Sequence, residues 1–273
     1  MQDLFQLAQS GAVTPASLGY YFPAEFAPQE AMWLSWPHKE ESWPGKIQTI
    51  YAPYAQFVKE VASGQEVHIN VADVTMQAFA KQQLELAGVR MDRVQFHFFP
   101  TNDAWCRDHG PAFLINPTAA LPKVLVKWNY NAWGEKYPPH DLDNQIPIQI
   151  AQALGIPYFT PGIVMEGGSV EFNGKGTLLT SKACLLNPNR NPHLNQAQIE
   201  KYLCDYYGVQ HILWVGDGIL GDDTDGHIDD ITRFVNADTV VTVVEENKAD
   251  GNYEILQENL HLLQQMRLEN GRQ

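Results

Sequence analysis

The chain has 273 residues, 44% of them hydrophobic, so it can bury a core and suits one large domain or two small ones. Its formal net charge of -14 argues against a nucleic-acid partner, because binding phosphates requires a basic face. A negative field attracts small cations, although charge spread evenly over the surface would serve only solubility. The three cysteines do not resemble a disulfide framework, and no apolar run reaches membrane-spanning length. Residues 1–21 lack the pattern of a signal peptide, so we expect a cytoplasmic protein without a membrane partner.

The first part of the chain is expected to alternate helices with strands. Residues 45–64 carry apolar side chains at steps of three and four, which predicts an amphipathic helix. Clustered β-branched residues predict a strand at 66–71. A second helix at 76–87 and a second strand at 94–99 are expected to follow.

From residue 112 onward, the predicted order is a hairpin, a helix, a strand and a polar loop, and this order recurs. Asn173-Gly174 is a strong signal for the turn of the second hairpin. No strand is expected after the last helix, so the third repeat is expected to lack its closing strand. The expected repeats are 112–115 with 124–130, 146–154 and 158–165; 169–172 with 177–180, 195–207 and 211–215; and 228–235 with 239–244 and 253–266.

The loops that follow the closing strands combine acids with glycine or aromatic residues. Asp108 and Glu166 are 58 positions apart, and Glu166 and His227 are 61 apart. A period of this length suggests stacked units whose equivalent loops meet at one end. Acidic loops gathered at one point would form a pocket for a cation, whereas loops spread around the outside would be ordinary turns.

The residue types in these loops suit a guanidinium group, which is planar and permanently charged. Asp108, Glu166 and Asp229 are carboxylates that could accept its N–H groups in pairs. His227 could transfer protons near neutral pH, and Trp105 could pack beside a cation or its aliphatic stem. Together they predict one site, with Asp108, Glu166, His227 and Asp229 converging on one cavity.

Taken singly, the same side chains have structural explanations. Asp108 could simply form a structural ion pair with Arg107, and Glu166 could be an acidic residue that stabilises a turn. His227 could be a hydrogen-bonded core histidine, and an isolated tryptophan such as Trp105 is usually part of a core. Their joint occurrence in equivalent loops favours the functional interpretation.

The sequence also bears on how closely a ligand could approach the backbone and on whether a metal could bind. Gly167 and Gly168 would let a ligand approach the backbone closely. The acidic run 222–230 does not fit the EF-hand template. Zinc is not expected, because His227 has no partner at helical zinc spacing and no cysteine pair is close in sequence. We therefore expect neither a metal nor a cofactor.

Several motifs resemble the agmatine deiminase and bacterial-type peptidylarginine deiminase family of guanidine-modifying enzymes. The similarity runs from residue 23 to the end of the chain, and NDAWCRDHGP at 102–111 is its most specific motif. The resemblance implies an α/β fold, a five-fold pseudosymmetric α/β propeller called a pentein, with a central active site. It implies a single deiminase domain over residues 1–273 that lacks its C-terminal blade. The other motifs are at 23–26, 33–37, 165–169, 186–192 and 224–229.

The chemistry that this resemblance implies is hydrolytic deimination. A cysteine thiolate attacks the guanidinium carbon, ammonia leaves, and a covalent thiouronium adduct is hydrolysed to a ureido product. By motif position, Asp108 and Asp229 would hold the guanidinium and His227 would be the acid/base. Glu166 would support the substrate or the histidine. Asp223, where the family often has Glu, is expected to contact the substrate.

In this family the nucleophilic cysteine lies in a glycine-rich segment near the C-terminus. None of the three cysteines matches that motif, so we expect the chain to end before the nucleophile. Cys184 and Cys204 lie in apolar stretches and are expected to be buried packing thiols. Cys106 is two positions from Asp108 and would face the same way in an extended segment, but a thiol beside two carboxylates has no evident activator.

Agmatine is the expected substrate, because residues 131–137 resemble the agmatine branch of the family. Its conversion to N-carbamoylputrescine and ammonia would belong to putrescine, and hence polyamine, biosynthesis. Two alternatives stay open: a peptidylarginine deiminase, and a non-catalytic propeller that binds cations. The expected partner is a small cationic guanidine, and the oligomeric state is left open, a homo-oligomer included.

Overall fold

The computed structural model describes residues 4–273 and has an α/β fold. The first three residues of the stretch inspected for a signal peptide lie outside that range. Among the described residues, no helix combines the length and apolar character that crossing a bilayer requires. The described strands form three three-stranded sheets and one two-stranded sheet.

The elements of the first half are α1 (Leu4–Ser10), β1 (Ala31–Ser35), α2 (Ile47–Gly64), β2 (Glu66–Asn70), α3 (Val74–Leu86), β3 (Val94–His97), α4 (Cys106–His109), β4 (Ala112–Ile115), β5 (Lys123–Val126) and α5 (Ala132–Glu135). Those of the second half are α6 (Ile146–Leu154), β6 (Tyr158–Phe159), β7 (Val170–Phe172), β8 (Thr177–Ser181), α7 (Lys182–Leu185), α8 (Gln196–Tyr207), β9 (His211–Val215), β10 (Thr232–Asn236), β11 (Thr239–Thr242) and α9 (Tyr253–Gln265).

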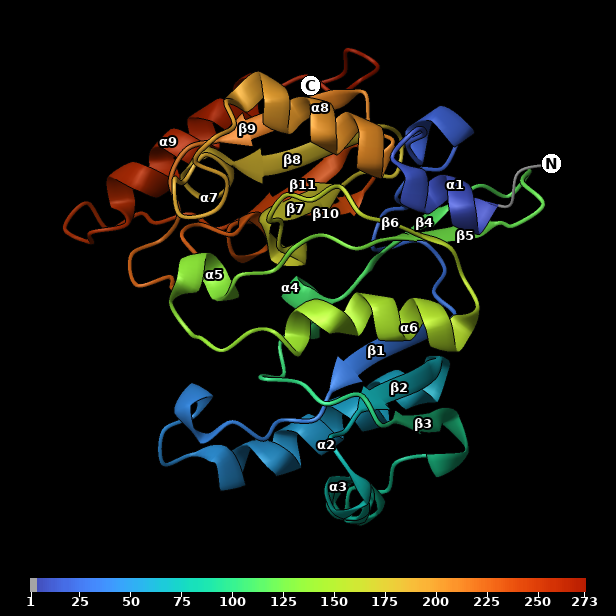
Figure 1. Ribbon diagram of the computed structural model, residues 1–273. Helices are drawn as coiled ribbons and strands as arrows, with labels where there is room; N and C mark the ends of the chain where they lie inside the picture. Colours follow the sequence, from blue (N-terminus) through green and yellow to red (C-terminus); the bar gives the residue numbers. More distant parts are fainter. Residues whose placement is uncertain (1–3) are drawn as a thin grey trace.

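The first unit is a parallel sheet in the order β1-β2-β3, covered by α2 and α3 (Figure 1). The helix α2 buries Ala55, Val58 and Ala62, which follow the predicted apolar spacing. The Asp73 side chain caps α3 by accepting two backbone N–H groups at 2.9 Å. The two helices and the strands β2 and β3 confirm the predicted elements within a few residues, whereas the sequence analysis missed β1.

The next two units confirm the predicted repeat of hairpin, helix and strand. In one, β5 pairs antiparallel with β4 and parallel with β6. In the other, β8 pairs antiparallel with β7 and parallel with β9, with Val170 opposite Thr180 and Leu179 opposite Leu213. The strands β10 and β11 then form a further antiparallel pair, followed by α9.

Three predicted strands are at least three residues shorter than expected. The strand β5 ends at Val126 and β6 at Phe159, and only an isolated bridge from Asn129 to Val164 continues their pairing. Pro161 lacks an N–H, and Gly162 has a φ of 84°, so this stretch cannot keep regular strand geometry. Residues 228–230 form a 3-10 turn, so the third hairpin begins at β10 instead of residue 228.

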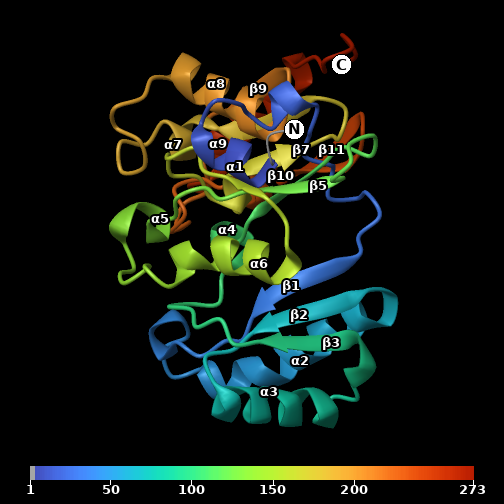
Figure 2. The ribbon, with the colours of Figure 1, turned by 45° about the vertical axis from the view of Figure 1, so that its right-hand side comes forward.

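The units are arranged so that three turns meet in the interior. Figures 1 and 2 show α6 between the first unit and the sheet of β4 and β5, and Leu125, Ile146 and Ile150 form the core at this junction together with Trp33. Above α6, α4 packs against the turn Gly167–Ser169, and that turn packs against the turn Ile228–Asp230. This packing confirms that the acidic loops gather at one place.

Candidate active site

The glycine turn at 167–168 is the meeting point of the predicted site residues. A β-carbon on Gly168 would lie 2.4 Å from His227 Nδ1, 2.8 Å from Asp108 Oδ1 and 3.0 Å from Asp229 Oδ2. A β-carbon on Gly167 would lie 2.0 Å from the carbonyl oxygen of Arg107. Only glycine leaves room for three polar side chains to approach this backbone so closely.

The Asp108 carboxylate is buried and held by two donors from other segments. The backbone N–H of Gly168 donates to Oδ1 at 2.9 Å, and the indole N–H of Trp133 donates to Oδ2 at 3.1 Å. Burial raises the pKa of Asp108 above its usual range, although His227 and both hydrogen bonds oppose that rise. The carboxylate therefore has a fixed orientation towards His227.

His227 is buried among three carboxylates. Its Nδ1 lies 3.7 Å from Asp108 Oδ1 and 3.9 Å from Asp229 Oδ1, and its Nε2 lies 3.5 Å from Glu166 Oε2. Burial alone would lower the pKa of His227, but Asp108, Cys184 and Glu166 together raise it to about 11. The ring is therefore an imidazolium at neutral pH, with a proton on each nitrogen.

Arg190 joins this cluster of charged side chains, although the sequence analysis gave it no role. Its Nε donates to Glu166 Oε1 at 3.0 Å, and both side chains are fully buried. Its other nitrogens donate to the Thr224 carbonyl oxygen at 2.8 Å and to the Asp225 carboxylate. Burial would raise the pKa of Glu166, but His227 and Arg190 lower it, so the glutamate stays ionised. The only sequence signal was the resemblance of residues 186–192.

Asp229 lies at the more open side of the cluster, against Arg107. The Nε atom of Arg107 is 3.2 Å from Asp229 Oδ2, and its terminal nitrogens are 2.9 Å from Glu25 and 3.9 Å from Glu171. Burial raises the pKa of Asp229 to about 6, with Arg107 and His227 opposing the rise. These pairs replace the Arg107–Asp108 ion pair that was considered from the sequence.

A strained turn presents Trp133 to Asp108. Ala132, Trp133 and Glu135 have φ values of 51°, 56° and 65°, and Gly134 between them has 85°. Left-handed φ at non-glycine residues costs roughly 1–3 kcal/mol each and is typical of functional sites. The Asn131 side chain stabilises the turn by accepting the N–H of Gly134 at 2.9 Å. The segment that resembles the agmatine branch thus carries the indole donor, whose hydrogen bond the sequence did not indicate.

Trp105 and Asp223 lie outside the inner cluster, which comprises Asp108, Glu166, His227 and Asp229. Trp105 is 41% exposed, stacks on Trp43 with ring centroids 5.5 Å apart, and meets the edge of Trp133 at 6.2 Å. The core interpretation of Trp105 is therefore wrong. Asp223 is exposed and accepts a hydrogen bond from the Tyr137 hydroxyl. Substrate contact by Trp105 and Asp223 stays a prediction.

The three cysteines have different environments. Cys106 is in α4 and not in an extended segment, so its thiol turns away to Ser35 Oγ at 3.0 Å, which corrects the expected orientation. Burial raises the pKa of Cys106 to about 12. Cys184 is buried as expected, 3.7 Å from Glu166 Oε2, whereas Cys204 is only partly buried, which corrects the expectation of burial there.

The arrangement suits a planar cation that carries several N–H groups. Asp108 and Asp229 flank the Gly168 backbone, and their oxygens point to a common volume. His227, between them, holds protons that it can donate to a leaving group and recover afterwards. Within residues 4–273, the basic side chains around the cluster are not free to receive a substrate carboxylate, because Lys136, Arg107 and Arg190 are each paired with an acid.

Comparisons with known proteins agree with this chemistry. A family model described as Porphyromonas-type peptidyl-arginine deiminase matches residues 21–273. A Yersinia pestis relative is 38% identical over 245 residues, which cover 88% of this chain and 64% of the relative, so the chain spans less than two thirds of that protein. The agmatine deiminase of Pseudomonas syringae pv. tomato is 36% identical over 95% of this chain and 70% of its own.

Two solved structures are similar over most of the chain. The structure titled agmatine deiminase of Enterococcus faecalis catalysing its reaction has a TM-score of 0.87 and 33% identity, covering 97% of this chain and 72% of that one. A C. jejuni agmatine deiminase with a cysteine-to-serine substitution and bound substrate has a TM-score of 0.81 and 31% identity, with coverages of 93% and 72%.

Proposed function

Because the chain belongs to the Porphyromonas-type peptidyl-arginine deiminase family, we propose that its protein hydrolyses the guanidinium group of agmatine to N-carbamoylputrescine and ammonia. The observation that carries this proposal is the convergence of Asp108, Asp229 and His227 on the Gly168 backbone. The names of the Pseudomonas and Enterococcus relatives support agmatine as the substrate. A place in putrescine biosynthesis follows from the identity of the product.

The reaction divides among the residues by position. Asp108 and Asp229 accept N–H groups of the guanidinium and align its carbon for attack by a thiolate. As the sulfur–carbon bond forms and a carbon–nitrogen bond breaks, His227 gives its proton to the departing ammonia. Neutral His227 then takes a proton from water as the water oxygen attacks the thiouronium carbon. The adduct releases the thiolate and the ureido product, and the remaining hydroxyl proton passes to solvent, where ammonia takes it up as ammonium. Glu166, held by Arg190, keeps the ring in place throughout.

We infer that none of the three thiols of this chain is the nucleophile. The Cys106 thiol faces Ser35 and Asn70, and its raised pKa leaves little thiolate at neutral pH. Cys184 lies behind Glu166, where burial raises its pKa to about 11. Cys204 is on α8, outside the three turns. The cysteine-to-serine substitution in the C. jejuni structure supports a mechanism with a thiol nucleophile. We infer that residues 1–273 do not include that cysteine.

The repeated topology supports a proposal on the whole architecture. The sheets of β4–β6 and β7–β9 have the same strand order and directions, and β10–β11 begins a further copy. We propose that residues 1–273 form one domain, a five-fold pseudosymmetric propeller that a further blade closes on the open edge of β11.

Calorimetric titration of this chain tests the substrate proposal. We expect agmatine to bind. Arginine should bind at least about 10-fold more weakly, because its carboxylate lacks a free basic partner, and putrescine should not bind, because it has no guanidinium. Asp108→Asn should abolish binding, whereas Asp92→Asn removes the same charge from an exposed site and should not. Equal affinity for arginine, or normal binding by Asp108→Asn, would contradict the proposal.

The nucleophile is tested separately by incubating the chain with a haloamidine and mapping the adduct by peptide mass spectrometry. We expect no stoichiometric adduct on Cys106, Cys184 or Cys204. An adduct on one of them that agmatine prevents would overturn the inference about the nucleophile, while leaving the substrate proposal standing.

A further inference from the structure

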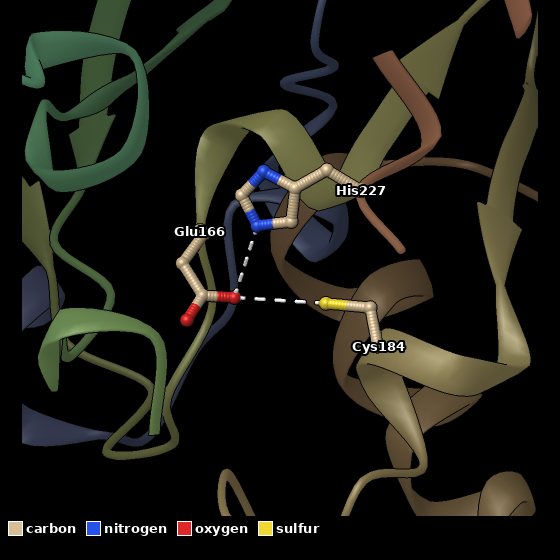
Figure 3. Close-up of side chains that lie close together, drawn as sticks. All are labelled: Glu166, Cys184 and His227. Carbon is tan, nitrogen blue, oxygen red and sulfur yellow. Dashed lines mark hydrogen bonds and ion pairs between the residues drawn. The ribbon is translucent and has the colours of Figure 1, made fainter. Parts of the chain in front are cut away.

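A buried cluster of metal-ligand atoms lies on the inner side of His227. Glu166 Oε2 is 3.7 Å from Cys184 Sγ and 3.5 Å from His227 Nε2, and the three ligand atoms all lie within 4.8 Å of one another. Figure 3 shows the three side chains pointing at one another from separate segments: a loop, the helix α7 and the turn before residue 228. A soft ligand (the thiol), a borderline ligand (the imidazole) and a hard ligand (the carboxylate) thus converge on one small volume.

The spacing of these atoms fits a tetrahedral zinc ion. Metal–ligand lengths of about 2.3 Å to sulfur and about 2.0 Å to nitrogen and oxygen place tetrahedral ligands about 3.3–3.5 Å apart. The two measured separations are within a few tenths of an ångström of that range. A second observation concerns hydrogen bonding: His227 Nε2 is buried and, apart from the 3.5 Å ion pair with Glu166, makes no hydrogen bond to any described residue.

We propose that Glu166 Oε2, Cys184 Sγ and His227 Nε2 bind a zinc-class divalent cation. Three protein ligands leave a fourth position for water, as in open zinc sites. The expectation of no zinc from the sequence rested on spacing along the chain, which cannot detect ligands that different turns bring together.

The exchange balances in charge and protons. Without the metal, the cluster holds a glutamate anion, an imidazolium and a neutral thiol, so its net charge is zero. The cation displaces one proton from His227 Nε2 and one from the Cys184 thiol to solvent, and the resulting glutamate, thiolate and neutral imidazole again sum to zero with the metal. Arg190, which pairs mainly with Glu166 Oε1, therefore meets the same buried net charge in both states.

The consequence is competition between the metal and the acid/base chemistry. A cation on Nε2 replaces one of the two protons of the imidazolium. The proton that stays on Nδ1, on the side of Asp108 and Asp229, then belongs to a ring that is a weaker acid towards the leaving ammonia, so a bound metal would inhibit the reaction reversibly. This consequence rests on the proposed function, but the metal site does not.

Cobalt(II) is a suitable probe, because a thiolate ligand gives cobalt an intense charge-transfer absorption. We expect this band when the wild-type chain is titrated with Co²⁺, its loss in Cys184→Ser, and its retention in Cys204→Ser, a matched control for another thiol. His227→Gln should lower the Co²⁺ affinity by at least about 10-fold while leaving the same thiol in place. Circular dichroism shows whether each variant is folded.

The outcomes separate the metal site from other thiol chemistry. A band that persists in Cys184→Ser, an affinity unchanged in His227→Gln, or no band in the wild-type chain would each overturn the proposal. If Cys184→Ser does not fold, His227→Gln decides alone. Because no agmatine is present, a failure of the proposed function does not affect this test.

Discussion

Gly168→Ala is the sharpest perturbation of the candidate site, because it adds one methyl group where the side chains of Asp108, His227 and Asp229 meet. The residue does not require a positive φ, so alanine is compatible with the backbone and the effect is steric. The new carbon would stand 2.4 Å from His227 Nδ1, about 1 Å inside ordinary contact, and 2.8 Å and 3.0 Å from Asp108 and Asp229 oxygens.

The cost follows from what must move. Overpacking in a buried region costs roughly 1–3 kcal/mol. If His227 shifts by about 1 Å from its 3.7 Å separation to Asp108, their attraction at an effective dielectric of about 20 falls by about 1 kcal/mol. We therefore expect a loss of about 2–4 kcal/mol in unfolding free energy. The methyl group also occupies the volume between the carboxylates, so agmatine affinity should fall roughly 100-fold, or about 2.7 kcal/mol.

Urea unfolding and agmatine calorimetry measure the two effects on the same samples. Gly64→Ala is the matched control: Gly64 ends α2, its added carbon would meet nothing within 4 Å, and helix propensity should stabilise that variant by up to about 1 kcal/mol. Gly64→Ala should bind agmatine normally. Agmatine binding by Gly168→Ala within about two-fold of wild type would refute the placement of the guanidinium beside this backbone.

Three further predictions concern the charges of the site. Arg190→Met should cost about 3–5 kcal/mol in urea unfolding because it leaves Glu166 buried without its cation, whereas Lys201→Met removes an exposed pair and should cost less than about 0.5 kcal/mol. Because the pKa of Asp229 is raised to about 6 and the cation binds the ionised form, agmatine affinity measured by calorimetry should fall as the pH drops below about 6, and Asp229→Asn should flatten that dependence. In a longer protein that includes the nucleophile, Asp108→Asn should lower kcat/KM by a factor that corresponds to several kcal/mol of lost transition-state stabilisation. Near-normal activity would count against the role of Asp108.

Much of the fold was accessible from the sequence, since local patterns determine single elements. The strand β9 and the helix α6 lie where apolar and β-branched spacing predicts them, and Asn195 caps α8 as its residue type suggests. The strand β1 was missed because Ala31–Ser35 is short and partly exposed, and its identity as a strand depends on pairing with β2. Pairing of that kind is a tertiary property that no local window contains.

The candidate site likewise contains residues that the sequence indicated and one that it did not. The recurrence of acids in equivalent loops predicted that Asp108, Glu166, His227 and Asp229 lie together, and the structure places these side chains within 4 Å of His227, while their roles stay a prediction. Arg190 was missed because its partner Glu166 is 24 positions away, and nothing about an arginine in a loop indicates that it will be fully buried.

The balance of buried charge explains why so acidic a cluster can exist and still receive a cation. On the inner side, Arg190 offsets Glu166, and on the outer side Arg107 offsets Asp229. His227 offsets Asp108, but the two arginines also serve other acids: Arg190 pairs with Asp225, and Arg107 with Glu25 and Glu171. With Lys136 and Arg233 counted, five cations face six carboxylates. A guanidinium therefore adds charge where the protein leaves a deficit, and a carboxylate beside it would meet the same acids. The preference for a substrate without a carboxylate follows from this uneven pairing, and it needs no residue dedicated to rejecting arginine.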